Sequence, residues 1–307
     1  MDQSVLETVQ ALIDQEALPP SYVSTVERTI LPLAEHIAEQ FQQKQAAVIV
    51  GVHGAQGTGK STLTLFLKQL LDHHFNVRTA SFSLDDIYLT KVEREHLAQS
   101  VHPLLLTRGV PGTHDVGLGE RVLDQLLAAS AGTRVPVPVF DKAIDDRLSE
   151  DQWPGFEGPA DVVLVEGWCM GAVPVKDRRE LSAPVNALEL SEDPDAIWRH
   201  YVNDCLDDGY RAFFERMDTL IMLNAPSMEC VLEWRTLQEH KLARRLGDAP
   251  KEGGSVQPLR IMTDDEVARF VMHYERITRR CLAEMPSRAD IVIDVAEDHS
   301  LGLSKRE

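Results

Sequence analysis

The chain lacks an excess of positive charge and any long apolar run. Its 307 residues carry a formal net charge of -18, whereas binding to nucleic acids relies on clustered lysine and arginine that release counterions. No apolar run approaches the roughly 20 residues that span a bilayer, and the first residues contain no secretory signal. We therefore expect a protein that binds neither nucleic acid nor a membrane.

Cysteine is scarce and scattered. The sequence has 4 cysteines, and none stands at the spacing of a metal site or a redox pair. They are interpreted as reduced thiols that pack as small apolar side chains, which predicts a cytoplasmic location. Hydrophobic residues make up 43% and charged residues 26% of the chain, as in an ordinary globular enzyme. Nothing in the sequence indicates an oligomeric state.

Helical and strand-like segments follow one another in a regular order. Residues 1–45 carry apolar residues at helical spacing, and we expect them to pack on the main domain. Apolar runs of strand length then occur at 46–53, 77–84, 161–166, 219–224 and 290–295. Helical patterns lie between most of them, at 60–74, 118–129, 195–217 and 263–284. This alternation predicts one α/β domain over 46–307, wound around a mostly parallel sheet.

A glycine-rich loop connects the first apolar run to the first helical pattern. It reads Gly54-Ala55-Gln56-Gly57-Thr58-Gly59-Lys60-Ser61-Thr62, and it contains the G-x-x-x-x-G-K-S spacing of a P-loop. Glycines let the backbone amides turn toward phosphate oxygens, and the following helix N-terminus attracts the same anion. We expect the loop to bind ATP, with Lys60 on the β- and γ-phosphates and Ser61 on Mg²⁺.

A P-loop alone does not distinguish kinases from GTPases, transporters or motors. The run ending at Asn224 continues Ala225-Pro226-Ser227, which is not the Asn/Thr-Lys-x-Asp signature of guanine recognition. The Leu-Ser-Gly-Gly-Gln signature of transporters is also absent, and 307 residues leave little room for a motor's lever. These absences favour a kinase. The alternative is an ATPase that acts as a switch or assembly factor.

Carboxylates end two of the predicted strands beside the P-loop. Asp85 and Asp86 follow the second run, where one of them can orient an acceptor hydroxyl and take its proton. The alternative is that both are solvated or cap the next segment. Glu166 ends the run at 161–166, and we expect it to bind Mg²⁺ or the waters of that ion.

Several segments resemble the uridine kinase, phosphoribulokinase and pantothenate kinase superfamily, and within it the D-glycerate 3-kinase group. They are Asp85-Asp-Ile-Tyr88, Arg108-Gly-Val-Pro-Gly-Thr-His114-Asp115, Phe140-Asp-Lys142, Trp153-Pro154, Val165-Glu-Gly-Trp168, Tyr201-Val-Asn-Asp204 and Met262-Thr-Asp-Asp-Glu-Val267. The resemblance extends over residues 46–296. It implies a P-loop NTPase three-layer fold, ATP as the phosphoryl donor, and a small hydroxy acid, D-glycerate above all, as the acceptor.

The resemblance also implies which residues surround the acceptor. Asp85 matches the acceptor-orienting aspartate of the family, and the neighbouring segments supply Tyr88, Arg108, His114, Asp115, Lys142 and Arg147. A carboxylate substrate needs a cationic partner, which Arg108, Lys142 or Arg147 can provide. Phe140 stands where the group usually has tyrosine, and the loop after Lys142 is shorter. A nucleoside, pantothenate or another sugar acid therefore stays open as the acceptor.

Positive charge gathers once more after the run at 219–224. The segment 234–247 carries several basic residues on a helical pattern, and related kinases close such a segment over ATP. We predict a lid at about 235–260, with Arg235 contacting the transferring phosphoryl group because it matches the Trp-Arg pair of the family. The alternative is an exposed basic helix face.

Overall fold

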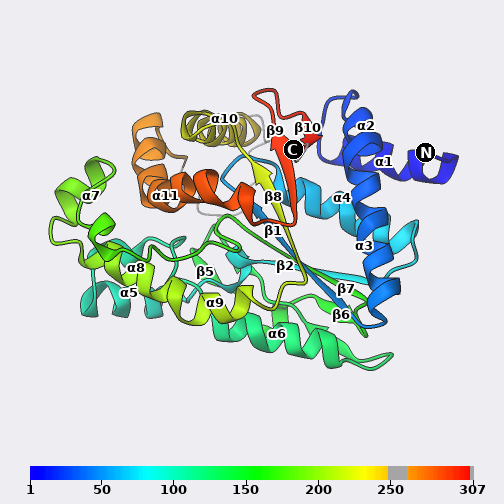
Figure 1. Cartoon of the computed structure of the whole chain (residues 1–307), viewed down its shortest axis with the longest axis horizontal. Coiled ribbons are helices and arrows are strands. Elements are labelled where there is room, and N and C mark those ends of the chain that lie inside the picture. Colours follow the sequence, from blue (N-terminus) through cyan, green and yellow to red (C-terminus); the bar gives the residue numbers. More distant parts are fainter. Residues whose placement is uncertain (248–260, 305–307) are drawn as a thin grey trace.

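A central sheet lies between layers of helices (Figure 1). The structure is a computed structural model that describes residues 1–247 and 261–304. Six strands form the main sheet in the order β10-β9-β8-β1-β7-β2, and every neighbouring pair is parallel except β10 with β9. The strands are β1 (Val48–Gly54), β2 (Thr79–Ser83), β7 (Val162–Gly167), β8 (Thr219–Asn224), β9 (Ile291–Val295) and β10 (Leu301–Leu303). The predicted α/β fold with a mostly parallel sheet is confirmed.

Successive residues of each central strand face opposite sides of the sheet and enter two separate hydrophobic cores. In β1, Val50 belongs to one core and Ile49 to the other. In β7, Leu164 and Val165 divide in the same way. Because both faces are covered, these strands are mostly apolar and lack the alternating pattern of a half-exposed sheet.

The first helical layer combines the N-terminal segment with the helix after the P-loop. Its helices are α1 (Gln3–Gln15), α2 (Tyr22–Thr25), a π-helical turn η1 (Val26–Ile30), α3 (Leu31–Lys44) and α4 (Lys60–His73). Val9 of α1, Ile37 of α3 and Leu67 of α4 share one core with the face of the sheet that carries Val50 and Leu164. The N-terminal helices thus buttress the helix that begins at the P-loop.

The second layer covers the other face and was predicted less completely. Its helices are α6 (Val116–Ala128), α8 (Ile197–Asp207), α9 (Gly209–Phe214) and most of α11 (Asp264–Glu284). The single helix predicted over 195–217 is in fact two, because the chain turns at Asp208 and restarts at Gly209. Helix α5 (Lys91–Ser100) was not predicted, and neither were α7 (Ala187–Glu192) and strand β10.

One long helix and several short elements complete the described chain. Helix α10 (Met228–Gly247) follows β8, and the short strands β3 (Arg134–Pro136), β4 (Phe140–Asp141), β5 (Asp146–Arg147) and β6 (Gly155–Glu157) form two small ribbons outside the main sheet. The 3-10 turns are η2 (Leu84–Ile87), η3 (Pro103–Leu106), η4 (Glu150–Gln152), η5 (Arg178–Leu181) and η6 (Met285–Ser287). None of the helices in the described part of the chain is long and apolar enough to cross a membrane.

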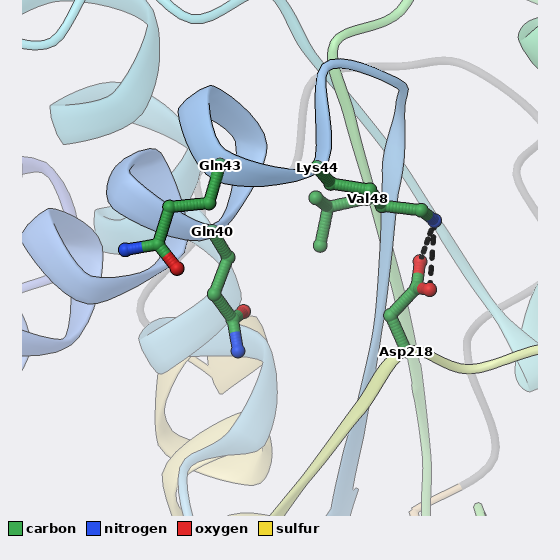
Figure 2. Close-up of a pocket in the computed structure, with 5 residues that line it drawn as sticks. All are labelled: Gln40, Gln43, Lys44, Val48 and Asp218. Atoms are coloured by element: carbon green, nitrogen blue, oxygen red, sulfur yellow. Dashed lines mark hydrogen bonds and ion pairs between the residues drawn. The ribbon is translucent and has the colours of Figure 1, made fainter.

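An ion pair fastens the N-terminal helices to the amino end of the sheet. Lys44, the last residue of α3, donates to both carboxylate oxygens of Asp218 at 2.7 and 2.6 Å (Figure 2). Beside the pair is a shallow hollow of about 320 Å³, which Gln40, Gln43 and Val48 also line. Val48 begins β1, whereas the P-loop follows its last residue, so this hollow lies at the opposite end of the sheet from the P-loop.

Candidate active site

A cavity of about 530 Å³ lies at the carboxyl end of the parallel strands. Ligands of doubly wound sheets bind at this edge. The lining residues come from the P-loop, the ends of β2 and β7, the β4–β5 hairpin, the loop before α6, and helices α10 and α11. They are Gln56, Gly57, Lys60, Ser61, Ser83, Asp85, Asp86, Tyr88, Arg108, Lys142, Glu166, Trp168, Arg235, Gln238, Glu239, Leu242, Phe270 and Tyr274. The charged side chains among them are four cations, Lys60, Arg108, Lys142 and Arg235, and four carboxylates, Asp85, Asp86, Glu166 and Glu239.

The P-loop has the backbone conformation that its glycines allow. Gly57 and Gly59 have φ angles of +83° and +88°, in the left-handed region that favours glycine. A Cβ at Gly57 would lie 2.5 Å from the Cβ of Trp234, so only glycine lets α10 pack this closely against the loop. Helix α4 begins directly afterwards at Lys60, which aims its free N–H groups and dipole at the loop.

Ser61 and Glu166 form a pair beside the P-loop that fits a divalent cation. The Ser61 hydroxyl donates to Oε1 of Glu166 at 2.9 Å. Oε2 of Glu166 is buried and has no hydrogen-bond partner in the described part of the chain. A hydroxyl and one carboxylate are the kind of donor set that leaves the remaining positions of the ion to phosphate oxygens and water. Residues 1–247 and 261–304 contain no cluster of three or more His, Cys, Asp or Glu side chains that could hold an ion alone.

Asp85 and Asp86 both line the cavity, but their carboxylates have different partners. Lys142 donates to Oδ2 of Asp85 at 2.7 Å, and the Tyr88 hydroxyl donates to Oδ1 at 2.8 Å. Burial alone would raise the pKa of Asp85, but the positive charges of Lys142 and Lys60 outweigh it and hold that pKa below its usual range. Asp85 is therefore an ionised, cation-paired carboxylate.

Asp86 instead completes the cap of η2. Its Oδ2 accepts the backbone N–H of Ser83 at 2.9 Å, which closes a capping box with the Ser83 hydroxyl. Burial, followed by the nearby charges of Asp85 and Glu166, raises the pKa of Asp86 to about 6. Of the two readings left open by the sequence, capping applies to Asp86 and not to Asp85.

Three residues predicted to surround the acceptor lie outside the cavity lining. His114 is buried behind Tyr88, with the two rings stacked at 4.6 Å. Asp115 caps α6 by accepting the N–H of Leu118 at 2.8 Å. Arg147 donates to Asp115 at 3.3 Å and to the backbone oxygen of Tyr88 at 3.3 Å. His114, Asp115 and Arg147 therefore support the cavity wall rather than face the cavity.

Helices α10 and α11 close the remaining side. Arg235 pairs with Glu239 at 2.8 Å, and its guanidinium carbon lies 5.6 Å from the centre of the Phe270 ring. Glu239 is only 3% exposed and also accepts the N–H of Met262 at 2.9 Å. The predicted lid extended to about residue 260, and its part from 248 to 260 lies outside the described residues.

Nothing in the sequence indicated that α11 contributes to the site. Phe270 and Tyr274 line the cavity one helical turn apart, and the Tyr274 hydroxyl donates to the backbone oxygen of Arg108 at 3.0 Å. An aromatic pair at this spacing on an amphipathic helix is the ordinary pattern of a buried face. Only the packing of α11 against the loop at Arg108 identifies the pair as part of the site.

The chain is similar in sequence to known kinases. The chain is 32% identical over 260 residues to an uncharacterized kinase of Schizosaccharomyces pombe, an alignment that covers 82% of this chain and 87% of that protein. It is 28% identical over 267 residues to the chloroplastic D-glycerate 3-kinase of Arabidopsis thaliana, covering 82% of this chain and 53% of the plant protein. No protein-family model matches the chain.

A solved structure extends the likeness to three dimensions. The D-glycerate 3-kinase of Cryptococcus neoformans superposes with a TM-score of 0.73 at 25% identity, over 90% of this chain and 98% of that one. The fold of this chain therefore matches that of a D-glycerate 3-kinase over most of both chains. The chain belongs to the family of P-loop kinases that includes the D-glycerate 3-kinases, and it is an ATP-binding phosphotransferase with an alcohol group as acceptor.

Proposed function

We propose that the chain transfers the γ-phosphoryl group of ATP to a hydroxyl of a small hydroxy acid, with D-glycerate as the substrate and its 3-hydroxyl as the acceptor. The observation that carries this proposal is the shared cavity, which Asp85, Arg108 and Lys142 line together with Lys60 and Ser61. The names of the plant and fungal relatives support D-glycerate. The four unpaired cysteines fit the cytoplasmic location that we also propose.

On the donor side, the P-loop from Gly54 to Thr62 would bind the phosphates of ATP. Lys60 would contact the β- and γ-phosphates, and Arg235 would stabilise the charge on the transferring group. Ser61 and Glu166 would hold Mg²⁺, which neutralises phosphate charge when it is bound. The ion pair with Glu239 and the ring of Phe270 keep Arg235 on the cavity side of α10.

On the acceptor side, Asp85 would orient the hydroxyl and accept its proton. An ionised carboxylate can do so at neutral pH, and the bonds from Tyr88 and Lys142 fix its two oxygens. Arg108 would offer positive charge to the acid group of the acceptor, whereas Lys142 pairs with Asp85. His114, Asp115 and Arg147 would act indirectly, because they support Tyr88 and the wall behind it.

The test is a direct assay of acceptor dependence. Purified protein is incubated with ATP, Mg²⁺ and one acceptor from a panel of D-glycerate, L-glycerate, glycerol, pantothenate and uridine. ADP formation is followed with time, and the product is identified by phosphorus NMR. We expect D-glycerate to accelerate ADP formation most and to yield a phosphate ester at carbon 3.

Two results would contradict the proposal in different ways. A higher kcat/KM with pantothenate or uridine than with D-glycerate would assign a different acceptor, while the proposed phosphoryl transfer would still hold. ADP formation that no member of the panel accelerates would count against a kinase of small hydroxylated molecules. That result would favour the alternative function, an ATPase that acts as a switch or assembly factor.

A further inference from the structure

The sequence indicated three cations, Arg108, Lys142 and Arg147, as possible partners of an acidic acceptor. In the structure these three have different surroundings. Lys142 is bonded to Asp85 at 2.7 Å, so its charge is committed to that carboxylate. Arg147 pairs with Asp115 and does not line the cavity. Arg108 also lines the cavity, and its partner Asp145 is shared with Arg94, so this group keeps one positive charge. Of these three, Arg108 is the cation best placed to read a carboxylate on the acceptor.

Arg108 is held from one side by a residue that the sequence did not indicate. Nη1 of Arg108 donates to Oδ1 of Asp145, in the short loop between β4 and β5. Asp145 has a φ angle of +56°, a left-handed conformation that aspartate and asparagine tolerate better than most residues. The tight loop therefore turns the Asp145 carboxylate toward Arg108.

Asp145 is anchored in turn by a fully buried arginine. Arg94 of α5 is 1% exposed, and its Nη2 lies 3.0 Å from Oδ2 of Asp145. The same guanidinium donates to the backbone oxygens of Leu89, Leu106 and Asp145 at 3.3, 2.7 and 2.6 Å. A buried arginine with this many partners is rigid, so the carboxylate that it holds has a fixed position.

The Phe140 ring contacts the same two cations. The guanidinium carbon of Arg108 lies 5.4 Å and that of Arg94 5.9 Å from the ring centre. An aromatic face attracts a cation at this distance. With two arginines and one carboxylate, the cluster keeps an excess of one positive charge, which a ligand carboxylate can neutralise.

We propose that Asp145, held by Arg94, is a positioning residue. It fixes Arg108 against the Phe140 ring, where Arg108 binds the carboxylate of the acceptor. This inference rests on the proposed hydroxy-acid acceptor. It gives the shortened loop after Lys142 a specific task, because that loop provides Asp145. A tethered guanidinium loses less side-chain freedom when it binds a carboxylate than a free one does.

The experiment compares steady-state constants of the full chain and four variants, namely Asp145→Asn, Arg108→Gln, the double variant, and Asp141→Asn as control. Asparagine keeps the left-handed turn and removes only the charge. Asp141 lies on the same hairpin, and in the described part of the chain its carboxylate accepts only the N–H of Ala143. We expect Asp145→Asn to raise the KM for D-glycerate about tenfold, the size of one weakened charged hydrogen bond. The KM for ATP and kcat should change less than about twofold.

The double variant distinguishes positioning from a general structural role. If Asp145 acts through Arg108, Asp145→Asn adds nothing to the KM for D-glycerate once Arg108 is glutamine. Phe140→Leu provides a second, independent variant, because it removes the aromatic face without touching Asp145. We expect it to raise the same KM about threefold.

Each contrary outcome has a definite meaning. An undiminished effect of Asp145→Asn in the Arg108→Gln background would overturn the positioning role, as would equal rises in both KM values. A lower KM for D-glycerate in Asp145→Asn would show that Asp145 competes with the acceptor. Wild-type protein that phosphorylates no acidic acceptor would refute the proposed function, and this inference with it, before any variant is compared.

Discussion

The two sides of the cavity are built in different ways. The donor side consists mostly of consecutive residues, Gly54 to Thr62, between β1 and α4. The acceptor side is assembled from the end of β2, the loop at Arg108, the β4–β5 hairpin and α11. A continuous loop can bind phosphate through its own backbone. A site assembled from several segments depends on ion pairs such as Asp85 with Lys142 and Arg108 with Asp145.

The largest expected effect separates the two sides most clearly. We expect Asp85→Asn to lower kcat by about 10²–10⁴-fold, the usual contribution of a general base, with the affinity for ATP unchanged. Single-turnover rates and equilibrium binding of ATP provide the measurement. Asp86→Asn is the matched control and should lower kcat less than about tenfold, because an amide oxygen can still accept the Ser83 N–H. The reverse ranking would assign the base to Asp86.

On the donor side, we expect Lys60→Ala to lower kcat by about 10²–10³-fold, since it removes a positive charge that would stabilise the transferring phosphoryl group. Unlike Asp85→Asn, it should also weaken ATP binding. The measurement is ATP titration alongside the kinetic assay. Lys91→Ala, which changes an exposed lysine at the start of α5, is the control. Unchanged ATP affinity in Lys60→Ala would mean that the lysine does not contact the bound phosphates.

A smaller effect is expected at Ser61 and Glu166, the two residues proposed to hold Mg²⁺ on the donor side. We expect Glu166→Gln to raise the concentration of Mg²⁺ needed for half-maximal activity about tenfold, because one charged ligand is lost. Removal of divalent ions with a chelator should abolish turnover in both proteins. Activity is measured against Mg²⁺ at fixed ATP. An identical Mg²⁺ requirement in the variant would exclude Glu166 as a ligand.

The smallest effect concerns stability on the acceptor side. Burial lowers the pKa of His114 from 6.5 to about 4. At a pH between these two values the unfolded chain binds a proton at this histidine and the folded chain does not. The free energy of unfolding is therefore at its full value above the unfolded pKa, and it decreases as the pH falls through this window. We expect His114→Asn to lessen this loss by about 1 kcal/mol between pH 6 and pH 5.

Thermal unfolding at several pH values measures that difference. His36→Asn, at an exposed position of α3, should leave the pH dependence of the wild type unchanged. A residual slope should persist in His114→Asn, because burial also lowers the pKa of His53, to about 3. Parallel curves for wild type and His114→Asn would show that His114 is not buried in its neutral form.

The same contrast explains how much could be predicted from the sequence. The parallel strands were predictable because both of their faces are buried, and the P-loop because its chemistry is local. Helix α5 was missed because its one buried side chain is Arg94, so no apolar periodicity marks it. For the same reason the link from Arg94 through Asp145 to Arg108 has no signature in the sequence. It exists only where α5 and the β4–β5 loop meet.

The close packing of Gly57 against Trp234 has a practical consequence. Trp234 is 5% exposed and touches the loop that receives the phosphates of ATP. Its indole also lies 4.6 Å from the ring of His299. Any change in the loop on nucleotide binding therefore alters the surroundings of a natural fluorophore. The chain has only 4 tryptophans, and Trp168 also lines the cavity, so tryptophan emission can report occupancy of the site without a label.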